Sequence, residues 1–156
     1  MKSQILKIVK GVHFDESLSL PAYQTEGAAG ADLCACFEDR GEIVVNPGER
    51  VLIPTGLFFE IPAGLEVQIR PRSGLSFKTT LFVVNSPGTI DSDYRGEIKI
   101  IMGNWGQTPQ VIKHGDRVAQ MVVAEVVRLE FEVVKELSET VRAGGGFGST
   151  GIQRNC

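Results

Sequence analysis

The chain has 156 residues, a formal net charge of −3 at pH 7 and a hydrophobic fraction of 42%. A chain of this length buries about two-thirds of its unfolded surface, so one domain can be stable without metal or disulfide cross-links. Its 18 glycines and 7 prolines indicate many turns and therefore short strands. The slightly acidic balance argues against a protein that mainly binds a nucleic-acid backbone, because such proteins carry a clustered basic face.

No apolar run approaches the roughly 20 residues that a helix needs to cross a bilayer. The N-terminal residues lead into a strand-like segment without the apolar core of a signal peptide, so we expect a cytoplasmic protein. The cysteines are Cys34, Cys36 and Cys156, an odd number without metal-ligand spacing. We interpret Cys34 and Cys36 as buried thiols on one face of a strand.

Three apolar segments predict buried strands. Residues 51–53 and 57–61 are apolar stretches that Pro54 and Pro62 interrupt, and residues 118–127 are rich in valine without proline. Short apolar runs of this kind are typical of strands that are buried on both faces.

Alternation between apolar and polar side chains marks residues 65–70 and 97–100, as in half-buried strands. Turn-forming sequences at 46–48, 61–64 and 86–88 separate the strands. The pattern therefore predicts an all-β domain with antiparallel strands in a sandwich or jelly roll.

Helical patterns are few. Residues 73–78 predict one short helix with Ser73 as its N-cap. Four apolar residues between 133 and 141 have helical spacing, but a strand followed by a loop explains them equally well. Residues 143–151 are too rich in glycine to build a core, so we expect a flexible arm at the C-terminus.

The first candidate site is at residues 70–75, where two arginines and a serine lie at the predicted helix start. Arg72 and the backbone N–H groups beside Ser73 and Gly74 could hold a phosphate through charge-assisted hydrogen bonds. A capped turn with solvent-directed arginines explains the same residues.

Residues 88–96 form a second candidate, because they place Asp91, Asp93, Tyr94 and Arg95 between two glycines. A carboxylate in a cleft can act as general base for a water, and a tyrosine ring offers a flat wall for a sugar. The alternative is a hairpin loop rich in Asp and Ser.

Two further polar residues have structural or functional interpretations. Gln120 interrupts the valine-rich segment, and a buried glutamine must bind either neighbouring backbone or a ligand. His114 has no Cys or His neighbour at metal-ligand spacing, so we interpret it as a surface or internally hydrogen-bonded histidine.

The C-terminal residues combine several glycines with Arg142, Phe147, Ser149 and Thr150. Glycines let backbone N–H groups approach phosphate oxygens, hydroxyls donate to the same oxygens, and an aromatic ring can stack on a base. This composition favours capture of a nucleotide phosphate, since a linker would not need the phenylalanine.

Five segments, in order, resemble the five motifs of the trimeric dUTP pyrophosphatases, or dUTPases. The segments are residues 29–33, 71–75, 85–96, 115–120 and 142–151. The resemblance implies a jelly-roll homotrimer with active sites at subunit interfaces, hydrolysis of dUTP to dUMP and pyrophosphate, and a supply of dUMP for thymidylate synthesis. It implies no nucleic-acid or membrane partner.

The resemblance also implies roles for individual residues. Asp91 would activate the attacking water, Tyr94 would lie under the deoxyribose and exclude a 2′-hydroxyl, and Asp32 would hold hydrated Mg²⁺ through water. Residues 1–141 would form the catalytic domain, and residues 142–156 a flexible arm that closes over the nucleotide. The other implied contacts are Asn85 with uracil; Ser73, Gly74 and Gln120 with the phosphates, in a substrate pocket that Arg72 supports; Arg142, Ser149 and Thr150 with the distal phosphates; and Phe147 stacked on uracil.

The implied chemistry agrees with these residue types. Hydrolysis at the α-phosphorus needs an in-line water, a base and fixed positive charge near the leaving pyrophosphate. Mg²⁺ prefers oxygen ligands and keeps several waters while it bridges phosphates. Cytosine would leave buried polar groups unpaired at the base edge, which rejects it strongly.

Three positions depart from the family's motifs. Ala143 replaces the glycine usual after the arginine of the last motif, and its Cβ would stiffen the start of the arm. Phe77 is bulkier than the small residue often found there, and Thr89 stands where valine or leucine is common. We expect altered affinity with unchanged chemistry.

Two alternatives are weighed against hydrolysis of dUTP. The related dCTP deaminases share parts of the second and third motifs, but residues 91–96 and the tail with its phenylalanine favour the hydrolase. A non-enzymatic β-sandwich nucleotide sensor would not need both Asp91 and Asp32. Incubation with dUTP and with dCTP in Mg²⁺ separates the three, because the products are pyrophosphate, ammonia or neither.

Overall fold

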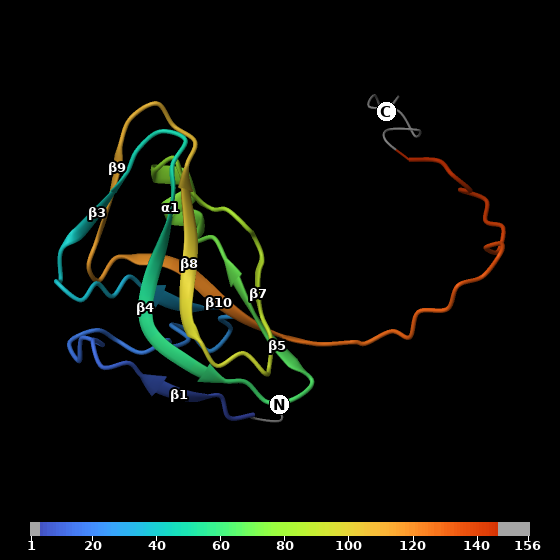
Figure 1. Ribbon diagram of the computed structural model, residues 1–156, viewed down its shortest axis with the longest axis horizontal. Helices are drawn as coiled ribbons and strands as arrows, with labels where there is room; N and C mark the ends of the chain where they lie inside the picture. The colour runs from blue at the N-terminus through green and yellow to red at the C-terminus, as the bar shows by residue number, and fades with distance from the viewer. Residues whose placement is uncertain (1–3, 147–156) are drawn as a thin grey trace.

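The structure is a computed structural model that describes residues 4–146 (Figure 1). Over these residues the chain forms ten strands and one short helix, which confirms the predicted all-β architecture. The elements are β1 (Lys7–Lys10), β2 (Ala31–Cys34), β3 (Glu42–Val45), β4 (Arg50–Glu60), β5 (Leu65–Arg70), α1 (Ser73–Lys78), β6 (Leu81–Val83), β7 (Gly88–Ile90), β8 (Glu97–Asn104), β9 (Gln110–Lys113) and β10 (Arg117–Glu125).

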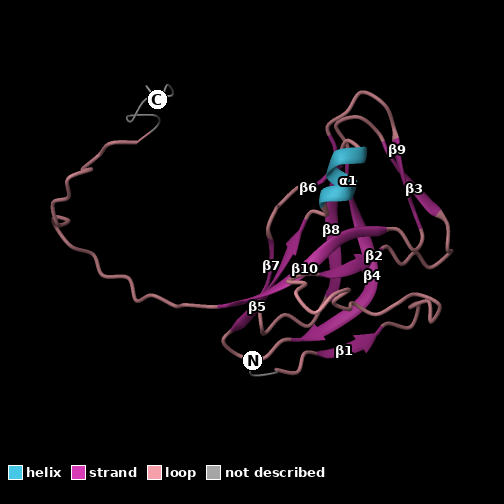
Figure 2. Cartoon of the chain, turned by 180° about the vertical axis from the view of Figure 1, so that it is seen from behind, coloured by secondary structure: helices cyan, strands magenta, loops and turns pink. Residues whose placement is uncertain are grey.

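Two four-stranded sheets pack against each other. The first has the strand order β1-β4-β8-β6 and the second β2-β10-β5-β7, while β3 pairs with β9 in a separate ribbon. All these pairings are antiparallel. Side chains of both sheets, including Ile53, Ile100, Leu33 and Val67, form one buried core. Figures 1 and 2 show this jelly-roll arrangement from opposite sides.

Strand β4 continues through Pro54, where the sequence pattern predicted an interruption. Pro54 lies opposite Lys99 of β8, and the register shifts between Pro54 and Phe58. A proline fits at such an irregularity because it cannot donate a ladder hydrogen bond. Gly56 lies within the shift with φ of 67°. The expectation of separate, fully buried strands was therefore wrong, and Leu52 on the outer face is 59% exposed.

Strand β10 also differs from the fully buried strand that the valine-rich segment predicted. It ends at Glu125, and its second half alternates between more and less exposed side chains. Met121 is buried, whereas Val123 is 37% exposed. The valines alone could not reveal this, because both faces of the segment carry apolar residues.

The short helix has the predicted bounds, from Ser73 to Lys78. Its N-cap is Arg72, whose backbone is extended, and no side chain forms the capping hydrogen bond. The prediction that Ser73 caps the helix was wrong because Ser73 is already the first helical residue.

After β10 the chain leaves the two sheets and runs away from the body (Figure 1). Residues 126–146 contain neither helix nor strand, so both interpretations of residues 133–141 were wrong for the isolated chain. Large apolar side chains of this segment are exposed, with Phe131 at 96% and Val133 at 100%. A strand needs a hydrogen-bonded neighbour, and this chain alone offers the segment none. Within the described residues, no helix has the length and apolar character required to span a membrane.

Candidate active site

In the second sheet, three neighbouring strands place polar residues directly opposite one another, in one row across the strands. Asp32 of β2 lies opposite Gln120 of β10, and Gln120 lies opposite Arg70 of β5. The chain then turns at Pro71 into α1, which begins beside this row. Segments distant in the sequence therefore meet at one end of the second sheet.

Asp32 is held between two arginines. Arg72 donates from Nε to Oδ1 at 2.7 Å and from Nη2 to Oδ2 at 3.2 Å, and Arg117 donates from Nη1 to Oδ2 at 3.2 Å. Arg72 also donates from Nη1 to the Arg117 carbonyl at 3.1 Å. We call Asp32, Arg72 and Arg117 the Asp32 cluster. Sequence reasoning gave Arg117 no role, although it lies in the matched segment 115–120.

Gln120 binds backbone in this structure. Its Nε2 donates to the Pro71 carbonyl at 2.8 Å, which fixes the turn just before Arg72. Gly30 lies beside it, and a Cβ there would lie 2.4 Å from Gln120 Oε1, so a larger residue would displace the end of the glutamine side chain. Ser73 and Gly74 are exposed on the first turn of α1. The predicted phosphate residues of these segments are thus brought together.

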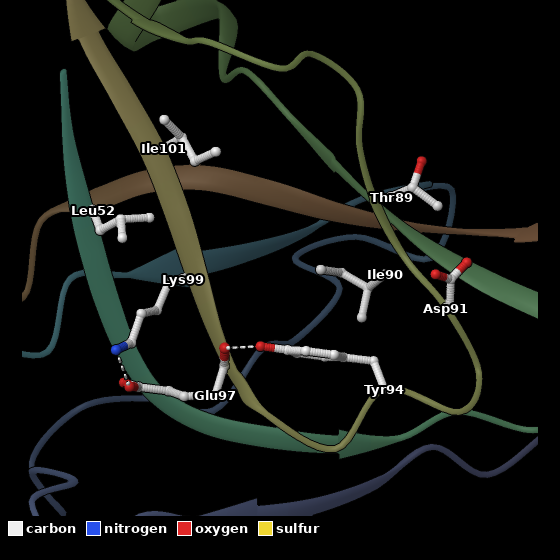
Figure 3. A pocket seen from close by; sticks show the side chains of 8 residues that line it. All are labelled: Leu52, Thr89, Ile90, Asp91, Tyr94, Glu97, Lys99 and Ile101. Atoms are coloured by element: carbon white, nitrogen blue, oxygen red, sulfur yellow. Dashed lines mark hydrogen bonds and ion pairs between the residues drawn. The ribbon is translucent and has the colours of Figure 1, made fainter.

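A second group surrounds a cavity of about 380 Å³ between β4, β7 and β8 (Figure 3). Tyr94 forms one wall, and its Oη donates to the Glu97 carbonyl at 3.2 Å. Its phenol lies against Gly96, where a Cβ would be 2.2 Å from Oη. Asp91 is exposed at the rim, and its carbonyl accepts the Tyr94 N–H at 3.1 Å. The ring and the carboxylate are therefore held by one turn.

Sequence reasoning missed two charged residues that line this cavity. Lys99 Nζ lies 3.3 Å from Glu97 Oε2, and Glu97 Oε1 accepts the Gly56 N–H at 2.9 Å. Both had been interpreted as the solvent-facing positions of a half-buried strand. The bulge of β4 at Gly56 links them to the cavity, and no local sequence pattern shows that contact.

Asn85 precedes β7, and its amide packs against Gly88, where a Cβ would lie 3.2 Å from Asn85 Nδ2. Gly88 pairs with Ile69 near one end of β5, whereas Ile90 pairs with Val67 toward the other end. Asn85 therefore lies toward the Asp32 cluster along β7.

The Asp91 carboxylate and the Asp32 cluster lie at opposite ends of β5. Asp91 follows Ile90, whose partner is Val67, whereas Arg72 follows the end of β5 at Arg70. Continuing this register places Asp91 at the level of Glu66. The four residues from Glu66 to Arg70 alone span about 13 Å of extended strand. One chain therefore presents two separate groups of candidate residues.

Arg142, the C-terminal candidate within the described residues, joins neither group in this chain. Arg142 donates from Nε to the Gly145 carbonyl at 2.8 Å, within its own turn. That turn lies far from the sheets in Figures 1 and 2. Ala143 has φ of 41°, so it adopts a left-handed backbone despite its Cβ. Phe147, Ser149 and Thr150 lie outside the described residues.

Among residues 4–146, no three His, Cys, Asp or Glu side chains are grouped so as to hold a metal ion. Asp32 is the residue predicted to hold magnesium, and its carboxylate already accepts three N–H groups. A carboxylate has about four acceptor positions, so roughly one remains for a water. This donor set fits a magnesium ion held through water and does not fit direct coordination next to two guanidinium groups.

Cys34 lies beside the Asp32 cluster and lines a cavity with Asp32 and Arg117. Burial, and then the Asp32 charge, raises the pKa of this half-buried thiol. Cys36 lies beyond the end of β2 and is buried. The two cysteines therefore do not share a strand face, and the buried-thiol interpretation describes Cys36 better than Cys34.

Comparison with known proteins identifies one family. The dUTPase family model matches residues 16–151. The deoxyuridine 5′-triphosphate nucleotidohydrolase of Roseobacter denitrificans is 58% identical over 137 residues, which are 88% of this chain and 90% of the relative. The enzyme of the same name from Rhizobium johnstonii is 53% identical over 137 residues, 88% of each chain.

Solved structures show the same fold. The dUTPase of Staphylococcus bacteriophage 80alpha with dUpNHpp superposes with a TM-score of 0.79 at 24% identity, covering 96% of this chain and all of the other. A mutant dUTPase of phage phi11 of S. aureus, described with a structural Mg(II) ion, gives a TM-score of 0.74 at 23% identity over 87% of this chain and all of that chain.

Proposed function

This chain belongs to the dUTPase family and hydrolyses dUTP to dUMP and pyrophosphate, and we propose that Asp91 activates the water for this reaction. The observation that carries the proposal is the position of Asp91 at the rim of the cavity that Tyr94 walls. An exposed carboxylate there can accept a proton from a water and orient it toward the α-phosphorus.

The Tyr94 side of the cavity would hold the nucleoside. The ring is fixed by its Oη contact with Glu97 and by its close approach to Gly96, so it can act as a rigid surface under the deoxyribose. A 2′-hydroxyl would then have no room. Asn85 lies toward the other end of β7, so uracil would extend from Tyr94 along β7 to reach its donor and acceptor amide.

The other end of β5 would hold the phosphates. Arg72 brings positive charge beside Ser73 and Gly74, and Gln120 fixes the backbone that leads to them. These groups would stabilise the charge of the leaving pyrophosphate. Mg²⁺ would be held by the phosphates and, through water, by Asp32, and when bound it supplies further positive charge.

We also propose that the working enzyme is a homotrimer with sites between subunits. Asp91 and Arg72 are too far apart in one chain to act on the same α-phosphate. Asp91 lies beside the Glu66 end of β5 and Arg72 beside its Arg70 end, and about 13 Å of strand separates the two ends. A closed ring of three copies repeats one head-to-tail interface, so Asp91 of one copy can meet the Asp32 cluster of the next.

Exposed apolar surface supports this assembly. Leu52 and Trp105 are 59% and 77% exposed on the body. In residues 127–133, Val127, Leu129 and Phe131 alternate with charged residues and are exposed, which is typical of a strand that pairs with another chain. Burial against neighbouring copies would remove both surfaces from water.

Residues 1–141 would form the catalytic domain. The C-terminal arm, residues 142–156, would complete the site of a neighbouring copy. Arg142, Ser149 and Thr150 would bind the distal phosphates, and Phe147 would stack on uracil. A free nucleotide substrate and the free thiols of Cys34 and Cys36 agree with a cytoplasmic enzyme.

Two measurements test the proposal. Incubation with Mg²⁺ and dUTP should release pyrophosphate, whereas dCTP should yield no ammonia. Asp91→Asn keeps the side-chain shape and removes the base, so turnover should fall by roughly 10²–10⁴, with dUpNHpp binding retained.

The matched control is Asp93→Asn, which removes the neighbouring exposed carboxylate. It should leave turnover within about threefold of the parent, since Asp93 lies outside the cavity walled by Tyr94. Equal losses in the two variants, or normal turnover in Asp91→Asn, would remove Asp91 from the mechanism.

A further inference from the structure

A charged network lies outside the site described above. Asp15 is the one buried acidic or basic residue among residues 4–146. Its carboxylate accepts the Ser17 N–H at 2.9 Å on Oδ1, and on Oδ2 it meets Arg40 Nε at 2.9 Å and His114 Nε2 at 3.0 Å. A buried charge is tolerated only when it is paired and hydrogen-bonded. Loss of one partner would therefore leave the Asp15 carboxylate incompletely paired and destabilise the fold.

His114 connects this carboxylate to a second loop. The Phe37 N–H donates to His114 Nδ1 at 3.0 Å, and a backbone N–H can only donate. The same Nδ1 lies 3.1 Å from the Phe37 carbonyl, so the Phe37 backbone holds one side of the ring while Nε2 lies against Asp15. The His114 side chain is 12% exposed, so water does not replace these partners.

The same histidine sits on the loop that leads to the Asp32 cluster. Its own N–H donates to the Gly41 carbonyl at 2.9 Å, and the next residue, Gly115, donates to the Ala35 carbonyl at 2.8 Å with φ of 84°. The loop then enters β10 at Arg117. The backbone that leads from His114 to Arg117 is thus fixed against the segment that follows β2.

Arg117 depends on this backbone because its side chain is 57% exposed and only its tip is bound, to Asp32. Its carbonyl also accepts one of the Arg72 hydrogen bonds. A shift of the loop would therefore misdirect both arginines of the Asp32 cluster. It would leave the cavity of Asp91 and Tyr94 untouched, since those residues belong to β7, β8 and the turn between them.

We propose that His114, braced by Asp15, is a positioning residue for binding of the magnesium-bound triphosphate. The inference rests on the proposed function of the Asp32 cluster. His114 touches neither nucleotide nor metal, and it acts by holding the loop that aims Arg117 at Asp32 and presents a carbonyl to Arg72.

The test compares two ligands of the full-length enzyme. The analogue dUpNHpp with Mg²⁺ needs the Asp32 cluster, whereas dUMP lacks the distal phosphates and reports mainly on the nucleoside cavity. Loss of two hydrogen bonds in His114→Ala should weaken binding of dUpNHpp with Mg²⁺ about tenfold and leave dUMP within about twofold. His114→Gln returns a polar partner to Asp15 but none to the Phe37 backbone, so it should weaken the analogue only about threefold.

His13→Ala is the matched control, because His13 is exposed and its only described ion pair is with Glu38 at the surface. Neither ligand should change there. If His114→Ala does not fold, the Gln variant carries the same comparison. Equal weakening of both ligands, or no weakening of the analogue, overturns the positioning role. Asp32→Asn is measured in parallel, and if it binds the analogue normally, the proposed function of the cluster has failed and the inference falls with it.

Discussion

Asp32 shows how neighbours decide what a carboxylate can do. An isolated aspartate would be a direct metal ligand, but three N–H groups from Arg72 and Arg117 occupy most of its acceptor positions. The remaining acceptor position of the carboxylate suits a bound water. The resemblance around residue 32 implies a magnesium contact through water, and the geometry of the two arginines is compatible with that proposal.

Tyr94 allows a prediction about sugar choice at the scale of a single side chain. Its ring is proposed to exclude a 2′-hydroxyl by contact alone, and its Oη is held by the Glu97 carbonyl and lies close to Gly96. Tyr94→Ala should therefore raise kcat/KM for UTP relative to dUTP, by about tenfold or more for one removed steric clash. Competition assays with both nucleotides measure the ratio. Tyr94→Phe, which keeps the ring, should retain the parent's preference, and an unchanged ratio in Tyr94→Ala would place 2′-hydroxyl rejection elsewhere.

At the scale of the elements, the sequence predicted what local patterns determine. Alternation identified β5 and the start of β8, and residues 73–78 form the predicted helix. The errors arose where a distant contact decides the outcome. Pro54 remains in β4 because β4 shifts its register against β8 at that point. Likewise, Glu97 and Lys99 of β8 line a cavity only because residues of β4 and residues of β7, from the other sheet, lie beside them.

In the candidate site, too, local patterns could be predicted from the sequence and distant contacts could not. Motif residues such as Arg72, Ser73 and Asp91 could be named from the sequence, since each lies in a short segment with its own composition. The role of Arg117 could not, because it depends on the register between β10 and β2. The Asp15–His114 contact joins loops 99 residues apart, and no local signal announces it.

This loop network predicts a dependence of stability on pH. The hydrogen bonds from Ser17, with smaller contributions from Arg40 and His114, outweigh burial and hold the pKa of Asp15 below its ordinary value. A carboxyl whose pKa is lowered by folding stabilises the protein above its unfolded pKa of about 3.9, and that stabilisation is lost as pH falls through the folded pKa. Asp15→Asn should therefore melt well below the parent at pH 7, and the gap should narrow below about pH 4. Thermal unfolding at fixed protein concentration measures it, with Asp93→Asn as a control that shows no such gap.

The proposed homotrimer accounts for two features of the whole molecule. Its body is complete by Glu125, yet the next twenty residues carry exposed apolar side chains away from it. The two groups of site residues also lie at opposite ends of β5. Both features have one explanation if neighbouring copies complete each site, as the motif resemblance also implies.

The arm gives a prediction at this scale. Within the described residues, deletion of 143–156 removes none of the buried core, so the truncated chain should remain folded and trimeric by circular dichroism and light scattering. Hydrolysis of dUTP should fall by at least about 10², because the distal phosphates lose their charge-assisted contacts. A truncated protein that dissociates or unfolds would contradict the assignment of these residues to the arm.

Whether the arm acts on a neighbouring copy can be decided by mixing two inactive chains. One carries Asp91→Asn with its arm intact, and the other lacks residues 143–156 but keeps Asp91. After joint unfolding and refolding in equal amounts, a site is complete when its Asp91 comes from the truncated chain and its arm from the Asn chain. In a closed trimer with the arm acting in trans, about 1/2 × 1/2, or roughly a quarter, of the sites should recover. An arm that acts on its own chain restores none. Mass measurement verifies the mixed trimers, and activity no greater than that of the two variants refolded apart would exclude a shared site.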